Sequence, residues 1–313
     1  MKAPPENFGD SHHEKVYIII LNWNGWLDTL ACVESCSKLT WPNFRILVVD
    51  NGSTDGSEKK LRARLQNVKI LQSGSNLGFS GGNNLGIRIA IESGAKYVWL
   101  LNNDAVVDPD ALAALMNAML REPSAAIAGS KIYFHDDPQR IWSAGGRWRK
   151  GGLALRMRGA FQPDQGQFDK PCAIGSVSGC SMLVRIEALT RIGLLKEEYF
   201  LYWEDIEWCA RAQEAGYKVL FVPESKVWHR GSASTVDGSF LQFYYSTRNG
   251  FFFLHEYDPY LLPILVFYSI LFILKSLLGG NSMPLRGFCH GLTDYLKEKT
   301  GPQTTALNMK ITE

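Results

Sequence analysis

The first half of the chain alternates short apolar segments with segments of helical periodicity, and this alternation constrains the fold more than any other feature. Strands joined through helices form right-handed crossovers, so the pattern predicts a mostly parallel sheet flanked by helices on both faces, a Rossmann-like α/β fold. The expected strands are Val16–Leu21, Arg45–Val49, Val68–Gln72 and Tyr97–Leu101. The expected helices are Trp26–Leu39, Ser57–Leu65, Gly82–Ser93 and Pro109–Leu120, the last capped by Asp108.

Polar, glycine-rich segments follow each expected strand. Ligands of parallel α/β sheets bind outside the carboxyl ends of the strands, so these segments predict a binding site at one edge of the sheet. The segments are Asn22–Gly25, Asp50–Ser57, Ser73–Asn84 and Asn102–Asp104.

The second half is less regular. His135–Phe168 is rich in Gly, Arg and Trp and reads as an excursion with hairpins, a candidate mobile flap. After it we expect a strand at Ser176–Val184, a helix at Glu204–Ala215 and a strand at Tyr217–Val222 that Pro223 ends.

Composition excludes several classes of protein. The 313 residues are 46% hydrophobic and 20% charged with a formal net charge of +2, which argues against disorder and against nucleic-acid binding. The six cysteines lack C-x-x-C spacing, so we expect reduced thiols and no zinc site. Val16–Leu21 is too short for a signal-peptide core, and no export signal is visible. His12–His13 on the polar end is expected to be solvated rather than metal-bound.

The C-terminal part changes character at Tyr260–Leu274, which carries no charge before Lys275. A spanning helix needs about 20 apolar residues, and a core helix is rarely apolar on all faces. We therefore expect membrane contact rather than a buried core helix, with spanning and interfacial positions both open. The predicted organisation is a flexible N-terminus (1–15), a catalytic domain (16–250) and a membrane-associating helical region (251–313).

Four features could carry chemistry, and each has a structural alternative. Asp50 at a strand end suits a ribose or base edge but also suits a capped turn. Asp104 suits a divalent cation near a diphosphate but could simply begin a helix. Glu204–Asp205, beside Tyr202 and Trp203, suits proton removal from a sugar hydroxyl, or ordinary helix capping. His229 becomes functional only if it converges with Asp104.

The ordered set of motifs resembles family 2 glycosyltransferases of the GT-A fold, especially their rhamnosyltransferase-like branch. The matching stretches cover about three quarters of the chain, from Val16 to Asn249. They are IIILNWNG (Ile18–Gly25), VVDNGSTDGS (Val48–Ser57), NLGFSGGNN (Asn76–Asn84), LLNNDA (Leu100–Ala105), GSVSGCSMLVR (Gly175–Arg185), YFLYWEDIEWCARAQEAGY (Tyr199–Tyr217) and VPESKVWH (Val222–His229).

The resemblance implies a role for each matching residue. Asp205 would be the general base, with Glu204 as the fallback, and Asp104 with His229 would bind Mg²⁺ or Mn²⁺. Arg248, in YYSTRN, would contact a phosphate. The nucleotide sugar would contact Leu21, Trp23, Asp50, Asn83 and Asn103, and the acceptor would contact Gly179, Cys180, Tyr202 and Trp203. Asn102 and Asn103 depart from the acidic form of the family's metal-binding element.

The implied activity is inverting, metal-dependent transfer of a sugar, L-rhamnose from dTDP-rhamnose at branch level, to a glycan or lipid-linked acceptor in cell-envelope polysaccharide synthesis. The implied location is the cytoplasmic face of the inner membrane. A noncatalytic sugar-binding or membrane scaffold protein and a nucleotidyltransferase remain alternatives. NWNG after the first strand has no Arg or Lys for a triphosphate, which disfavours a nucleotidyltransferase. No G-x-G-x-x-G follows this strand, which disfavours a dehydrogenase. The enzyme interpretation requires Asp104 and Asp205 to meet at one cleft.

Overall fold

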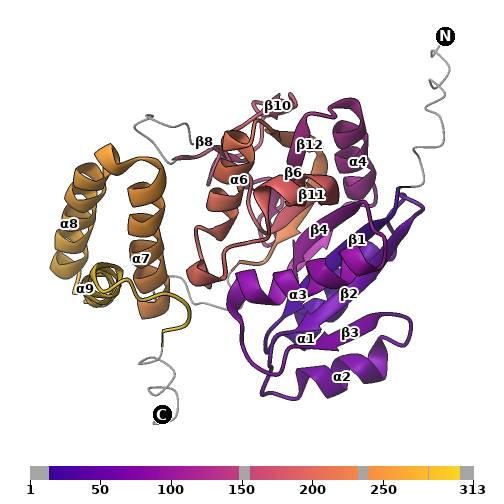
Figure 1. Cartoon of the computed structure of the whole chain (residues 1–313), viewed down its shortest axis with the longest axis horizontal. Coiled ribbons are helices and arrows are strands. Elements are labelled where there is room, and N and C mark those ends of the chain that lie inside the picture. The colour runs from indigo at the N-terminus through magenta and orange to yellow at the C-terminus, as the bar shows by residue number, and fades with distance from the viewer. Residues whose placement is uncertain (1–13, 148–155, 232–238, 281, 304–313) are drawn as a thin grey trace.

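The computed structural model describes residues 14–147, 156–231, 239–280 and 282–303. It contains a mixed sheet in the order β10-β12-β6-β11-β4-β1-β2-β3, with β5 and β7 paired at its side (Figure 1). The four expected strands are present and parallel: β1 (Val16–Asn22), β2 (Phe44–Asp50), β3 (Lys69–Gln72) and β4 (Tyr97–Asn102). The helices between and after them are α1 (Trp26–Cys36), α2 (Ser57–Arg64), α3 (Gly78–Glu92) and α4 (Ala111–Arg121).

Alternate residues of β1 enter two different cores because successive side chains of a strand point to opposite faces. Ile18 and Ile20 pack with Cys32 of α1 on one face, whereas Ile19 packs with Ile87 of α3 on the other. The predicted α/β fold is therefore confirmed, with β1 to β4 parallel, whereas most pairings in the rest of the sheet are antiparallel.

The sheet extends beyond the predicted strands through β6 (Ala125–Phe134), β11 (Ser181–Arg185) and β12 (Lys218–His229). Strand β6 was not predicted, because its first nine residues are all buried and so show no alternation. The predicted end of β12 at Pro223 is wrong. The register of β12 against β6 shifts between Val222 and Lys226, and such an irregularity tolerates a residue that cannot donate a ladder hydrogen bond.

The irregular region contains short strands rather than one element. β7 (Ile141–Ser143) pairs with β6, and the expected hairpin is present where β8 (Gly146–Arg147) pairs antiparallel with β9 (Arg156–Met157). Residues 148–155 of the predicted flap, and 1–13 with His12–His13, lie outside the described residues. The strand predicted from Ser176 begins only at Ser181. The small remaining elements are β5 (Ala105–Val107), β10 (Cys172–Ala173), η2 (Ile186–Ala188), α5 (Leu189–Ile192) and η3 (Glu197–Tyr199).

The C-terminal helices lie together at one end of the molecule, separate from the sheet (Figure 1). They are α7 (Phe240–Tyr257), α8 (Leu262–Leu278), which follows the turn η4 (Pro259–Leu261), and α9 (Met283–Leu296). Pro259–Leu278 is long and apolar enough to cross a membrane, and only 6% of its most apolar window is buried. The alternative of a buried core helix is thereby excluded. Residues 250 and 251, where the predicted catalytic domain ends, both lie within α7.

Candidate active site

The carboxyl ends of β1 and β2 lie side by side, with Asn22 opposite Asp50. Both side chains are fully buried. The Asp50 carboxylate accepts hydrogen bonds from Asn22 Nδ2 (2.7 Å), the Ser53 backbone N–H (3.0 Å) and Gln72 Nε2 (2.9 Å). These bonds fix the loop after β2 against the end of β1, which builds a rigid wall at the predicted edge of the sheet.

The other predicted nucleotide-sugar residues surround this wall. Leu21 lies against Gly82 of α3, where an added Cβ would come within 2.4 Å of Leu21 Cδ1. The Asn83 amide donates to the Phe79 carbonyl (2.9 Å), and the Asn103 amide donates to Thr29 Oγ1 (3.2 Å). Trp23 is half-buried. Their nucleotide contacts stay predictions.

Asp104 and His229 lie close together in space, although they are 125 residues apart in the sequence. β5 follows Asp104 and pairs with the end of β12, with Ala105 opposite His229. His229 Nε2 lies 3.1 Å from Asp104 Oδ1 and 3.2 Å from Asn102 Nδ2. Both side chains of the pair are at most 5% exposed. A carboxylate oxygen and an imidazole nitrogen at this separation fit two ligands of one divalent cation.

The other ring nitrogen of His229, Nδ1, is buried with no hydrogen-bond partner among the described residues. Trp142 of β7 packs edge-on against the imidazole, with ring centroids 4.9 Å apart. Trp142 was not predicted as a site residue, because its Gly- and Arg-rich surroundings show no periodicity that would place it beside β12.

Asp205 lies in the first turn of α6 (Glu204–Glu214). Its Oδ2 accepts the Gly179 backbone N–H (2.9 Å), and its Oδ1 accepts the Ile206 backbone N–H (2.8 Å). Burial raises the pKa of this carboxyl above its ordinary value, and the backbone hydrogen bonds oppose the shift. A half-buried carboxylate with a raised pKa, oriented by two donors, suits a general base.

Glu204 differs from its neighbour. It is 5% exposed, and its Oε2 has no hydrogen-bond partner among the described residues. Burial, followed by the charge of Asp205, raises the pKa of Glu204 well above its ordinary value. Because the pKa of Glu204 is raised further than that of Asp205, Glu204 ionises less readily, and this environment favours Asp205 as the base.

Asp104 and Asp205 both lie near the Gly179–Cys180 segment. Asp205 accepts the Gly179 N–H, while the backbone N–H of Asn102, two residues before Asp104, donates to the Cys180 carbonyl (3.0 Å). Burial and the charges of Asp104 and Asp205 raise the pKa of the Cys180 thiol well above its ordinary value. The two acids therefore lie near one buried thiol, and the cleft expected between them stays a prediction.

The loop before α6 is strained. Phe200, Tyr202 and Trp203 have φ angles of 62°, 66° and 76°, a left-handed conformation that non-glycine residues adopt only when their surroundings impose it. Asn249 of α7 imposes it here. Its Nδ2 donates to the carbonyls of Tyr199 (2.8 Å), Leu201 (2.8 Å) and Tyr202 (2.9 Å).

The surroundings of Arg248 do not fit the predicted phosphate contact. Its side chain is fully buried, and its guanidinium donates to Asn249 Oδ1 (2.9 Å), the Tyr244 hydroxyl (3.3 Å) and three backbone carbonyls. These carbonyls are those of Gly301 (2.7 Å), Glu198 (3.2 Å) and Tyr199 (3.1 Å). Five N–H groups with five partners leave no donor for a phosphate. Arg248 and Asn249 together form what we call the α7 clamp on residues 198–202.

The predicted acceptor residues divide into two groups. The Gly179 N–H donates to Asp205. A Cβ added to Gly179 would lie 2.9 Å from Phe79 Cζ, so only glycine leaves room for this ring. Cys180 is buried. Trp203 instead lies against α7, where an added Cβ on Gly250 would come within 2.9 Å of its Cζ2. Tyr202 is half-buried in the clamped loop.

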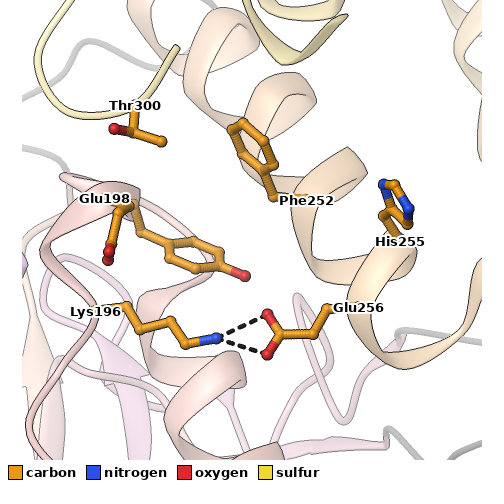
Figure 2. Close-up of a pocket in the computed structure, with 7 residues that line it drawn as sticks. Lys196, Glu198, Phe252, His255, Glu256 and Thr300 are labelled. Atoms are coloured by element: carbon orange, nitrogen blue, oxygen red, sulfur yellow. Dashed lines mark hydrogen bonds and ion pairs between the residues drawn. The ribbon is translucent and has the colours of Figure 1, made fainter. Parts of the chain in front are cut away.

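A hollow of about 360 Å³ lies where α7 meets the loop of residues 196–199 (Figure 2). Figure 2 shows Lys196 facing Glu256 of α7, and its Nζ lies 2.7 Å from both carboxylate oxygens. Lys196 also pairs with the buried Glu207 of α6 (3.1 Å), which accepts the Tyr257 hydroxyl (2.9 Å). The hollow therefore lies at the contact between α7 and α6, where Lys196 is paired with both Glu256 and Glu207.

Comparison with known proteins places these features in a family. The sequence profile described as glycosyl transferase family 2 matches residues 17–193. An N-acetylglucosaminyl-diphospho-decaprenol L-rhamnosyltransferase of Mycobacterium tuberculosis is 30% identical over 229 residues, covering 65% of this chain and 72% of the relative. A dTDP-rhamnosyl transferase, RfbF, of Shigella flexneri is 27% identical over 261 residues, covering 80% of this chain and 84% of the relative.

A solved structure, GalNAc-T7 with UDP, GalNAc and Mn²⁺, shares the fold with a TM-score of 0.56 at 16% identity. The match covers 69% of this chain and 44% of that one. At this identity the likeness concerns the fold alone, and it agrees with the predicted GT-A architecture.

Proposed function

This chain belongs to glycosyl transferase family 2 and is a glycosyltransferase that uses a nucleotide sugar; on that premise we propose that it carries out inverting, divalent-metal-dependent transfer to a lipid-linked acceptor. The donor we propose is dTDP-rhamnose, and the nucleophile is a hydroxyl of the acceptor glycan. The single observation that carries the mechanism is that both acids are tied to the Gly179–Cys180 segment: Asp205 Oδ2 accepts the Gly179 N–H (2.9 Å), and the N–H of Asn102, two residues before Asp104, donates to the Cys180 carbonyl (3.0 Å).

Asp205 acts as the general base in this proposal. Its carboxylate removes the proton of the acceptor hydroxyl while that oxygen attacks the anomeric carbon on the face opposite the nucleotide. The Gly179 and Ile206 N–H groups hold the carboxylate in one orientation during the transfer. A single displacement by the acceptor inverts the anomeric centre.

Asp104 and His229 would hold Mg²⁺ or Mn²⁺ through Oδ1 and Nε2. The bound cation would supply neutralisation of the negative charge on the departing diphosphate. The loop that Asp50 and Asn22 fix at the ends of β1 and β2 would lie against the nucleoside.

Two observations support a membrane-bound acceptor. Rhamnosyltransferases are among the relatives, one of which is named for a diphospho-decaprenol acceptor. The exposed apolar helix α8 is long enough to enter or cross a bilayer. We therefore place the enzyme at the cytoplasmic face of the membrane, where it would act in the synthesis of a cell-envelope polysaccharide.

The test separates the two acids. Asp205→Asn should lower kcat by about a hundredfold to ten-thousandfold with nearly unchanged donor affinity, because the base acts on the acceptor. Asp104→Ala should instead abolish the Mg²⁺- or Mn²⁺-dependent part of donor binding. Donor binding is measured by calorimetry and turnover by release of nucleoside diphosphate, with and without EDTA.

The matched control is Asp110→Asn, an exposed acid at the start of α4, which should behave as wild type. Loss of donor binding in Asp205→Asn would refute its role as base. Donor affinity that is insensitive to both EDTA and Asp104→Ala would refute the metal site.

A further inference from the structure

A second hollow, the apolar crevice, lies between α7, α8 and α9 and has a volume of about 220 Å³. Eight apolar and three hydroxyl-bearing side chains line it, and none of these described lining residues is charged. Its walls include Phe243 and Phe251 of α7, Leu265 and Phe272 of α8, and Phe288 of α9. A volume well above the roughly 30 Å³ of one water, with apolar walls, suits a segment of hydrocarbon.

The crevice exists because the three helices pack unequally. α9 approaches the backbone of α7 at two glycines: an added Cβ on Gly287 would lie 2.4 Å from Phe243 Cβ, and one on Gly291 would lie 2.6 Å from the Tyr244 carbonyl oxygen. In α8, by contrast, Ile273 is the buried residue among those described. The tight α7–α9 pair thus forms one side of the crevice, and the loosely attached α8 forms the other.

The surroundings of α8 identify the occupant. Phe267 (59%), Tyr268 (65%), Phe272 (50%) and Leu277 (40%) are exposed, and at 3.6 residues per turn they lie over about 220° of the helix circumference, more than one apolar stripe covers. A protein partner covers one stripe of a helix, whereas lipid covers it on all free sides. A crevice whose outer wall is such a helix opens toward hydrocarbon chains rather than toward water.

The inner end of the crevice reaches the catalytic loop. Trp203 lines the crevice and directly precedes Glu204 and Asp205 in the chain. Its indole packs on Phe253, with ring centroids 5.3 Å apart, and lies against Gly250. A chain that ends at Trp203 would therefore present its polar head beside the residues proposed to activate the acceptor hydroxyl.

We propose that the apolar crevice is the subsite for the hydrocarbon chain of a polyprenyl diphosphate-linked acceptor, and that Trp203 closes its inner end. This inference rests on the proposed lipid-linked acceptor and adds where its chain binds. It gives α8 two roles: its outer face contacts the membrane, and its inner face holds the end of the chain next to the head group.

The experiment fills the crevice and measures binding without any donor. Ser269→Phe places a ring into the crevice from α8, and Ser246→Phe places one from α7. Ser276→Phe, the same change on α8 outside the crevice lining, is the matched control. The probe is a fluorescent long-chain polyprenyl diphosphate in detergent micelles. Both filling variants should bind the probe at least about tenfold more weakly, because excluding about two methylene groups from the crevice costs that much affinity. The control should bind the probe as wild type does.

A short diphosphate of two isoprene units should lose less affinity than the long probe, because less of its chain enters the crevice. Unchanged affinity for the long probe in either filling variant that retains the wild-type Tm, or an equal loss in Ser276→Phe, would overturn the crevice assignment. Because no sugar is transferred, the outcome is independent of the donor and of Asp205. A wild-type protein that transfers rhamnose to soluble glycans but does not bind the probe would refute this inference alone.

Discussion

The ends of the parallel strands and the C-terminal helices follow opposite rules of burial. At the strand ends, Asn22 and Asp50 are polar and buried, and each is held by side chains of the neighbouring loops. In α8 most apolar side chains from Phe267 to Leu278 are exposed, with Ile273 as the buried one among them. The strand ends are held in one arrangement by internal hydrogen bonds. Helix α8 instead exposes apolar side chains that another apolar surface could cover.

Helix α7 belongs to both regions. One part of it forms the α7 clamp through Arg248 and Asn249, which holds the strained loop before Asp205. Another part contributes Phe243 and Phe251 to the apolar crevice. Helix α7 therefore joins the C-terminal helices directly to the loop that carries the proposed base.

Among the changes that test this comparison, the largest effect is expected from disrupting the α7 clamp. Asn249→Asp keeps the shape of the side chain but replaces a donor that three carbonyls share with a carboxylate, so the loop of residues 199–203 should shift. Displacing a catalytic group by about 1 Å costs roughly a hundredfold in rate. We expect kcat to fall about that much, measured with saturating donor and acceptor, while donor affinity stays near wild type.

Asn117→Asp, the same change at an exposed position of α4, is its control. Wild-type kcat in Asn249→Asp would show that the clamp does not position Asp205. Equal losses of donor affinity and kcat would mean that the variant disturbs the whole sheet.

A smaller effect is expected from changing only the exposed face. Phe267→Ser, Leu271→Ser and Leu274→Ser combined remove three side chains that are 59%, 46% and 52% exposed. Burying such a side chain in an apolar phase contributes about 1.5–3 kcal/mol, so the triple variant should bind lipid vesicles at least tenfold more weakly in flotation. Ile91→Ser, an equally exposed apolar residue on α3, should float as wild type does. Undiminished flotation of the triple variant would remove α8 from the membrane contact.

The smallest effect concerns Glu204. Its pKa is raised in the folded protein, so the folded state binds more protons, and stability falls as pH rises from the unfolded pKa toward the folded one. Glu204→Gln cannot ionise. The variant should therefore gain about 1–3 kcal/mol, a few degrees in Tm, at neutral pH and little near pH 4.

Thermal melts across that pH range test this, with the exposed Glu92→Gln as control. A Tm difference independent of pH would mean that Glu204 is not protonated in the folded protein at neutral pH. Loss of turnover equal to that of Asp205→Asn would restore Glu204 as a candidate base.

Local pattern predicted much of the fold but little of its pairing. The first four strands were predictable because each is a short apolar run bounded by turn residues. β6 was not, because a strand buried on both faces has neither alternation nor helical period. The continuation of β12 past Pro223 depends on the shift in its pairing with β6, which a local pattern does not show.

The sequence by itself determined the parallel sheet, the polar strand ends and the apolar character of α8, because each depends on residues close together in the chain. Only the tertiary structure decided which distant groups meet. It brought His229 to Asp104 through the β5–β12 pairing, and it gave Arg248 to backbone carbonyls instead of a phosphate. It also set Trp203 against α7. Long-range partners of a charged or aromatic side chain depend on how elements pack, and that information is not contained in any local pattern.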